Sequence, residues 1–268
     1  MASTGGGVRR EIAWEKFDAS ALAARGRRTV GATWRERMRQ EHLAVGAFAL
    51  LVRELAEVGC EPVVLALVAR ASADEVRHTE VCRRFAVALL GSEAVPRRFR
   101  GLPRVPRHVT ANAPDRALLH VVEMCCLSET LTGVYFTEML ARTTEPVARI
   151  AIESLLEDEI DHGRVGWAYL AARSRERTTH ALPQALPDML QRTFDPVFVA
   201  ASRARASEKD EEKLETHGYL GPHASAGVYA RALRDVILPG FERLGVDIKP
   251  LRPLVAKWHA PSDRGLAP

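Results

Sequence analysis

The chain has 268 residues, of which 47% are hydrophobic and 27% are charged. This ordinary globular composition excludes a mostly disordered chain and leaves enough apolar mass for a sizeable core. The formal net charge of +4 is a weak sign of a nucleic-acid partner, because only five of the 38 basic residues are lysines and the arginine excess is typical of GC-rich coding. Nucleic-acid binding is therefore the minor interpretation.

The start of the chain, residues 1–7, is small and polar and lacks the apolar stretch of a signal peptide. The longest apolar runs are far too short to span a bilayer. The four cysteines form no Cys-x-x-Cys pair, which excludes zinc-ribbon and thioredoxin motifs and favours reduced thiols in a cytoplasm. We expect a soluble, cytoplasmic protein with no membrane partner.

The apolar periodicity and the end signals predict four long helices, over residues 33–58, 62–90, 115–143 and 144–175. A capping box, Thr33-x-x-Glu36, predicts the start of the first helix, and Gly59 predicts its end. Gly91 ends the second helix, and the Pro- and Arg-rich segment 92–113 is expected to be a long crossover. The order of short turn, crossover and short turn is typical of a four-helix bundle with one long crossover.

Beyond residue 176 the pattern is less regular, with helical stretches at 184–205 and 224–244, a charge run at 207–215 and a Pro-rich tail at 250–268 that we expect to be irregular. Pro187, Pro196 and Pro239 are expected to break or kink the helices that contain them. Nothing marks a second domain. We predict a single domain over 1–268, in which accessory helices in 175–268 cover a bundle formed by 33–174.

The second and fourth predicted helices carry the same pattern, Asp-Glu-x-x-His, at 74–78 and 158–162. Glu and His three residues apart lie on the same face of a helix, so both can point at one metal ion. Helices one and three each add a glutamate at about the same height. The predicted metal ligands are Glu41, Glu75, His78, Glu129, Glu159 and His162. One such motif can be a solvated helix face, but two matched copies favour a dimetal site, because burying four carboxylates without a cation is very costly.

The aspartate that precedes each glutamate suggests a supporting role. A metal-bound histidine usually donates its other ring N–H to a nearby carboxylate. With pseudo-twofold symmetry, Asp158 would hold His78 and Asp74 would hold His162. Arg77 is expected to be the salt-bridge partner of a nearby carboxylate, without a catalytic role.

Helix three offers two candidate ligands, Glu129 and Glu123. They differ by six positions, about 600° of rotation along a helix, so they face different ways. We favour Glu129, because it shares its stripe with other inward-facing positions, and keep Glu123 as the alternative. The residues predicted to line a pocket beside the metals are Cys125, Cys126, Thr132, Gly133 and Phe136. Glycines near the ligands, among them Gly133 and Gly166, indicate either close helix packing or room for O2 and a substrate.

Residues 33–174 resemble the ferritin-like non-haem di-iron carboxylate superfamily. The resemblance rests on Glu41, Asp74-Glu75-x-x-His78, Glu129 and Asp158-Glu159-x-x-His162. Within this superfamily, the chain is most similar to stand-alone oxygenases and oxidases such as the arylamine N-oxygenases. The resemblance implies an all-α, ferritin-like four-helix bundle. Those N-oxygenases carry an additional His one turn before the last ligand Glu, where this chain has Leu155, so the resemblance does not extend to N-oxygenation itself.

The resemblance further implies an O2-dependent di-iron oxidoreductase, a monooxygenase or oxidase that acts on a small organic substrate. Its cofactors would be two iron ions, or manganese in one or both positions, with O2 as co-substrate. The sequence carries no flavin, haem or nucleotide motif, so we expect an external electron donor such as a ferredoxin or a flavin reductase. The alternatives are a ferroxidase or iron-binding ferritin-like protein and, from the basic pI alone, a tRNA-modifying di-iron hydroxylase. A homodimer is the commonest assembly for such a protein.

Overall fold

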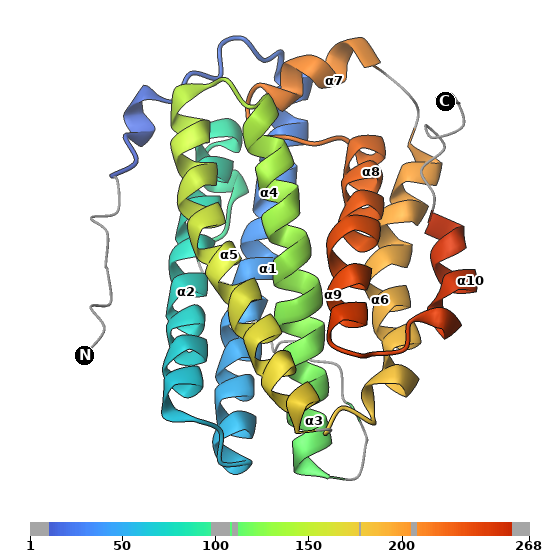
Figure 1. Cartoon of the computed structure of the whole chain (residues 1–268). Helices are drawn as coiled ribbons and strands as arrows, with labels where there is room; N and C mark the ends of the chain where they lie inside the picture. Colours follow the sequence, from blue (N-terminus) through green and yellow to red (C-terminus); the bar gives the residue numbers. More distant parts are fainter. Residues whose placement is uncertain (1–10, 98–107, 109–111, 177, 205–207, 259–268) are drawn as a thin grey trace.

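The computed structural model describes residues 11–97, 108, 112–176, 178–204 and 208–258. Every regular element within these ranges is helical, and they contain no strand (Figure 1). The prediction of an all-α protein is therefore confirmed. After a short 3-10 turn, η1 (Trp14–Lys16), the chain forms α1 (Ala24–Glu57) and α2 (Pro62–Leu90), which lie side by side and are joined by a turn at Gly59, where φ is +69°.

The capping box at Thr33 does not begin the first helix, which starts earlier, at Ala24. Thr33 lies inside α1, where its Oγ1 donates a hydrogen bond to the Thr29 carbonyl at 3.1 Å. The added turns pack against α2: Val30 is fully buried, and Gly31 lies directly against Leu89 and Leu90. Because packing of a buried face stabilises a helix more than a local cap does, the helix extends past the predicted start.

The third helical run has three parts, α3 (Ala113–Val121), a π-helical segment η3 (Val122–Glu129) and α4 (Thr130–Arg142). The side chain of Asn112 caps α3 by accepting a 2.8 Å hydrogen bond from the backbone N–H of Asp115. The run 113–142 is long and apolar enough to cross a membrane by length and composition, but 78% of its most apolar window is buried inside the protein. It therefore has the burial of a core helix.

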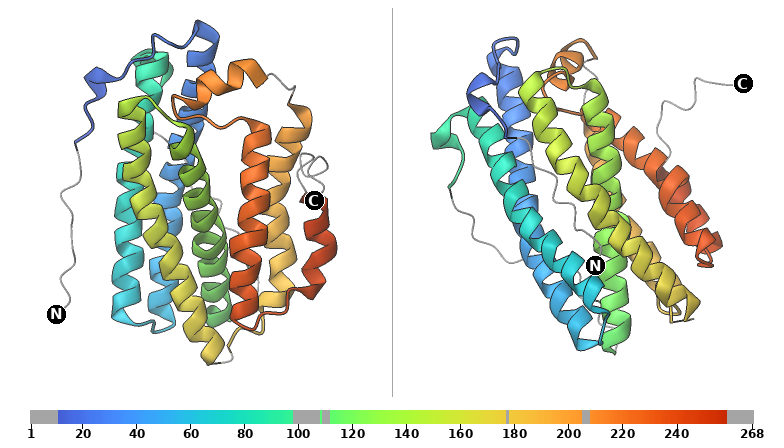
Figure 2. Two further views of the ribbon diagram at one scale, coloured as in Figure 1. Left: turned by 45° about the horizontal axis from the view of Figure 1, so that its top comes forward. Right: turned by 60° about the vertical axis from the view of Figure 1, so that its left-hand side comes forward.

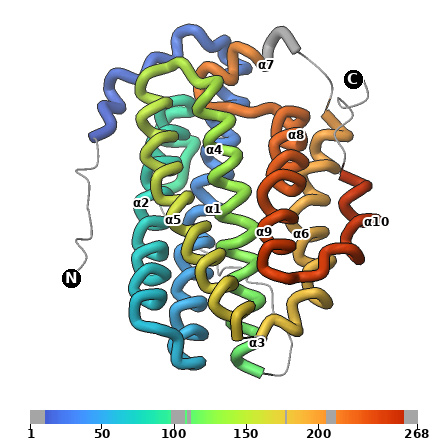
Figure 3. The backbone as a smooth tube through the Cα atoms, viewed as in Figure 1, coloured from blue at the N-terminus to red at the C-terminus, as the bar shows by residue number. Residues whose placement is uncertain are grey.

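The fourth long helix, α5 (Pro146–Arg175), is capped by Glu145, whose side chain accepts a hydrogen bond from the Ala148 N–H at 2.6 Å. The helices α1, α2 and α5 and the run from α3 to α4 lie side by side (Figures 1 and 2). The end of α2 and the start of α3 lie at opposite ends of these helices (Figure 3). The segment after α2 contains η2 (Ser92–Ala94), and most of the predicted crossover, 92–113, lies outside the described residues.

Apolar side chains form two buried clusters in this helical core. On α1, Met38 belongs to one cluster and Phe48 to the other, and on α5 Leu155 and Tyr169 are divided in the same way. Each helix thus has a gap between the two clusters. Glu41 falls inside the first of these gaps, and Glu159 and His162 fall inside the second. The fold thus places them midway along the helices, with apolar packing toward either end.

The C-terminal third is also helical, in the elements α6 (Leu182–Arg203), α7 (Glu208–Glu215), α8 (Pro222–Ala232), η4 (Leu233–Ile237), α9 (Leu238–Arg243), η5 (Lys249–Leu251), α10 (Arg252–Val255) and η6 (Ala256–Trp258). The helices α6, α8 and α9 stand beside α4 (Figure 1). Pro187 and Pro196 lie inside α6 without ending it, because the buried Leu186, Leu190 and Phe194 hold the helix in place.

The other two expectations for this third also need correction. Pro239 does not break the helix that contains it. The helix α9 follows directly on the π-helical segment η4, and Pro239 lies in its first turn. The tail is ordered as far as Trp258, whose Nε1 donates a 2.8 Å hydrogen bond to Asp195 and whose ring stacks on Phe194 at 5.1 Å. One large aromatic side chain thus anchors a segment whose prolines predicted irregular structure. Residues 259–268 lie outside the described part of the chain.

Candidate metal centre

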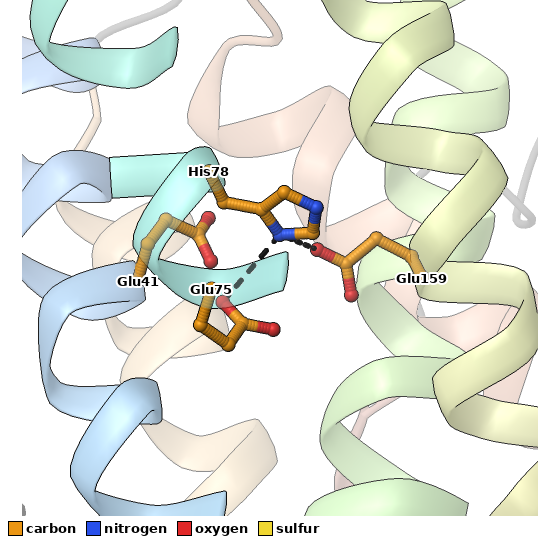
Figure 4. A group of neighbouring side chains, drawn as sticks. All are labelled: Glu41, Glu75, His78 and Glu159. Carbon is orange, nitrogen blue, oxygen red and sulfur yellow. Dashed lines mark ion pairs between the residues drawn. The ribbon is translucent and has the colours of Figure 1, made fainter. Parts of the chain in front are cut away.

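The structure brings all six predicted ligands together in the helical core. Two overlapping groups have potential ligand atoms within 4.8 Å of one another. The first group is Glu41, Glu75, His78 and Glu159 (Figure 4), and the second is Glu75, Glu129, Glu159 and His162. Since Glu75 and Glu159 belong to both groups, they lie at the middle of the cluster.

All six side chains are buried, with at most 7% of any residue exposed. Several polar atoms of these side chains have no hydrogen-bond partner among the described residues. They include the two carboxylate oxygens of Glu75, the Nδ1 of His78 and the Nδ1 of His162. The nearest oxygens are close but not bonded: Glu159 Oε1 lies 3.4 Å from His78 Nδ1, and Glu75 Oε1 lies 3.3 Å from His162 Nδ1. Buried polar atoms in native proteins are nearly always satisfied, so these atoms fit a cluster built around cations.

The electrostatics of the cluster agree with this. Burial, followed by repulsion from Glu75 and Glu159, raises the pKa of Glu41 well above its usual range. Burial by itself would lower the pKa of His162, but the carboxylates around it, Asp74 first, raise that pKa to about 12. Without metal ions the cluster therefore lowers its negative charge by holding protons. Two divalent cations would balance four ionised glutamates without those protons.

Each histidine turns its other ring nitrogen toward the aspartate of the opposite motif. Asp158 Oδ2 lies 3.2 Å from His78 Nε2, and Asp74 Oδ2 lies 3.5 Å from His162 Nε2. These are the two pairings that pseudo-twofold symmetry predicts. With Nε2 directed at an aspartate, Nδ1 of each ring faces the glutamates and is the atom that can bind a metal ion.

The predicted salt bridge of Arg77 is present. Its guanidinium makes a very short contact with Asp158 and donates to Ser154 Oγ at 2.7 Å and to the Ser154 carbonyl at 2.8 Å. Asp74 has a corresponding cation in Arg70, whose Nε lies 3.3 Å from Asp74 Oδ2.

Glu123, the alternative helix-three ligand, lies outside both groups. It accepts a hydrogen bond from His108 at 2.8 Å and pairs with Arg192 of α6 at 3.1 Å. Its side chain thus faces the crossover and an accessory helix, as the rotation between positions 123 and 129 requires. Glu129 is the helix-three member of the cluster.

A cavity of about 400 Å³ lies against the cluster, and Glu41, Glu129 and Glu159 form part of its wall. The apolar part of its lining is Leu43, Ala44, Ala47, Met124 and Leu131, and the polar part includes Arg37, Gln40, Ser128, Thr132, Thr193 and Tyr229. Of the predicted pocket residues, Thr132 lines this cavity. Gly133 instead lines a second, smaller cavity of about 260 Å³ that also reaches Glu129 and Glu159.

Cys125, Cys126 and Phe136 line neither of these two cavities. Both cysteines are buried, and Phe136 packs beside Trp34 with ring centroids 6.4 Å apart. A helix stripe that faces the core is wider than the part of it that meets these cavities, which explains the difference. The backbone of the cysteine pair packs directly against Gly166.

The two glycines have different explanations. A Cβ on Gly166 would lie 2.4 Å from the Cβ of Cys125, so close helix packing requires this glycine. A Cβ on Gly133 would have nothing within 4 Å. Packing does not require Gly133, which leaves open space beside Glu129.

Sequence reasoning missed several cavity residues. Arg37 lies one helical turn before Glu41, and Gln40 lies one turn before Ala44, so helix spacing could have identified both. Thr193 and Tyr229 come from α6 and α8, and the sequence gives no register between these helices and the core. No family model, curated protein or solved structure matches the chain. What the cluster does must therefore be inferred from its own geometry and chemistry.

Proposed function

We propose that the chain is a ferritin-like four-helix bundle that holds two metal ions and uses them with O2 to oxidise a small organic molecule. The observation that carries this proposal is the buried cluster of four glutamates and two histidines, in which both imidazole Nδ1 atoms and the central Glu75 lack hydrogen bonds. Oxygen and imidazole donors of this kind suit iron and manganese.

The residues fit two divalent ions in number and in charge. One ion would be held by Glu41 and His78 and the other by Glu129 and His162, with Glu75 and Glu159 shared between them. Four carboxylates carry four negative charges, which two divalent cations neutralise. The two supporting aspartates add no net charge, because Arg77 and Arg70 pair with them.

When bound, two iron ions would supply the redox chemistry and the O2 activation that side chains lack. The side chains around them have separate tasks. Asp158 and Asp74 hold the imidazole rings so that Nδ1 faces the centre. The apolar wall formed by Ala44, Ala47 and Met124 excludes water beside the ligands. Repeated turnover calls for electrons from a separate donor, of the ferredoxin or flavin-reductase kind.

The cavity favours an organic substrate over iron oxidation alone. Its volume of about 400 Å³ is in the range of small-molecule sites, and it meets the cluster directly at Glu129 and Glu159. Accessory helices contribute Thr193 and Tyr229 to its wall. A centre that only oxidised iron would need neither this cavity nor helices to cover it.

The first experiment measures the metal content of the chain after expression in iron-supplemented medium. We expect about two iron ions per chain, as in other carboxylate-bridged bundles. The double variant Glu75→Ala with His78→Ala should lose them, whereas Glu123→Gln should keep them, because Glu123 is also buried but lies outside the cluster. A wild-type chain that binds no transition metal would refute the proposal.

The second experiment follows O2 consumption by the iron-loaded chain with a chemical reductant and candidate amines, acids and aromatic compounds. We expect at least one of them to be oxidised and to raise the rate of O2 consumption. Uptake of iron far above two ions per chain, without oxidation of any organic compound, would instead support iron storage.

A further inference from the structure

The two ligand motifs match at every position but one. In the first motif the residue before the histidine is Arg77, and in the second it is Asp161. The remaining positions are the same or, for Val76 and Ile160, closely similar. Within the two motifs, the pseudo-twofold symmetry is therefore broken by a single exchange of a cation for an anion.

At the His78 end, this exchange produces a rigid support. Arg77 is a mainly buried side chain, 24% exposed, that contacts Asp158 and is itself anchored by two hydrogen bonds to Ser154 on α5. Asp158 in turn lies 3.2 Å from His78 Nε2. The orientation of the His78 ring is thus fixed through a chain of short contacts that joins α2 to α5.

At the His162 end, the support is looser. Asp161 cannot donate a hydrogen bond to Asp74, so the cation there is Arg70, which is 52% exposed and lies on the preceding turn of α2. The Arg70 guanidinium is shared, because its Nη2 also lies 3.5 Å from Asp158 and 3.7 Å from Asp161. The distance from Asp74 to His162 Nε2 is correspondingly longer, at 3.5 Å.

We propose that Arg77 makes the two metal positions inequivalent, so that the position at His78 fills before the position at His162. This inference rests on the proposed metal centre. A ring that is already held in its binding orientation loses less conformational freedom when a metal binds. An exposed and shared ion pair such as that of Arg70 contributes little to such orientation. Arg77 is therefore a positioning residue that acts on the metal through Asp158 and His78.

The charge of Arg37 opposes this order. Its guanidinium lies 3.6 Å from Glu41, a ligand of the first position, and a cation there weakens the attraction for another cation. The order of filling therefore depends on whether orientation outweighs this repulsion. Replacing Arg37 with Gln should widen the difference between the two positions.

The test is a titration of the metal-free, full-length chain with Mn²⁺, followed by electron paramagnetic resonance. In the wild type we expect the signal of an isolated ion up to one equivalent, followed by the signal of a coupled pair. Arg77→Gln should weaken binding of the first ion about 10- to 100-fold, the usual effect of removing such a support, so that the isolated-ion signal is lost. The matched variant Arg70→Gln removes a more exposed and more distant cation from Asp158, so it should weaken the first ion much less than Arg77→Gln does. His78→Ala should remove the tighter step, and His162→Ala should remove the weaker one.

Circular dichroism of each variant shows whether it is folded. If Arg77→Gln does not fold, Arg77→Lys replaces it, because a lysine keeps the charge but cannot make all of the arginine's contacts, and it should give a smaller loss of the first step. Two ions bound with equal affinity in the wild type, or a first step that survives both Arg77→Gln and His78→Ala, would refute the inequivalence alone. A wild type that binds no Mn²⁺ and no iron would refute the metal centre itself.

Discussion

Gly166→Ala and Gly133→Ala should change stability in opposite directions, although both glycines lie within helices beside the candidate centre. Replacing a glycine in a helix interior with alanine stabilises a protein by about 1 kcal/mol when the site has room. Gly133 has room, because an added Cβ meets nothing within 4 Å. We therefore expect Gly133→Ala to raise the free energy of unfolding by about 1 kcal/mol.

Gly166 has no such room. Its added Cβ would lie 2.4 Å from the Cβ of Cys125 and 3.0 Å from two backbone atoms of the cysteine pair, none of which can rotate away. Overpacking of this severity costs about 3 kcal/mol, against a gain of about 1 kcal/mol in helix propensity. The net expectation for Gly166→Ala is a loss of about 2 kcal/mol.

Thermal and urea unfolding of the chelator-treated chain, followed by circular dichroism, measure both effects. For a chain of this size, the predicted changes correspond to a melting temperature higher by about 2–4 °C for Gly133→Ala and lower by about 4–8 °C for Gly166→Ala. The urea m-value should stay constant, since neither change alters the surface exposed on unfolding. A destabilised Gly133→Ala, or a neutral Gly166→Ala, would refute the helix spacing on which this reasoning depends.

Three further predictions follow. The pKa of His162 is raised to about 12 and that of Glu41 well above its usual range, so the metal-free cluster holds protons at neutral pH. Metal binding should therefore release protons and weaken as the pH falls. Calorimetry in buffers of different ionisation enthalpy measures the proton release, and metal uptake without it would contradict the prediction. Ala44→Leu, which adds bulk to the cavity wall, should weaken binding of organic ligands in equilibrium dialysis while the metal content stays unchanged; a loss of metal would show that the cavity and the ligands are not separable. Trp258→Ala should lower the free energy of unfolding by about 3–5 kcal/mol in urea titrations, because a buried ring and its hydrogen bond to Asp195 are lost. An unchanged unfolding midpoint would mean that the tail does not pack as described.

Much of the core was predictable because its signals are local. The second helix has the predicted bounds, 62–90, since a proline at its start and Gly91 at its end define it. The six clustered ligands follow from helix spacing alone, and the structure brings them together. Their role as ligands stays a prediction. The pairings of Asp158 with His78 and of Asp74 with His162 required only symmetry between two motifs.

The missed features depend on contacts between distant segments. The extra turns of α1 depend on the burial of Val30 and the packing of Gly31 against the end of α2, which no local signal at Thr33 reveals. The π-helical segment η3 has ordinary helix-forming residues, so its hydrogen-bond pattern cannot be deduced from residue types. Thr193 and Tyr229 reach the cavity only because α6 and α8 stand beside α4, and that arrangement has no sequence motif.

The most direct test of the central claim is a crystal structure of the iron-loaded chain with anomalous scattering measured at the iron edge. We predict two peaks within the cluster, one bound by the group that contains Glu41 and His78 and the other by the group that contains Glu129 and His162, with Glu75 and Glu159 between them. An iron-loaded crystal without a peak in the cluster, with its carboxylates and imidazoles bonded only to one another, would contradict the claim.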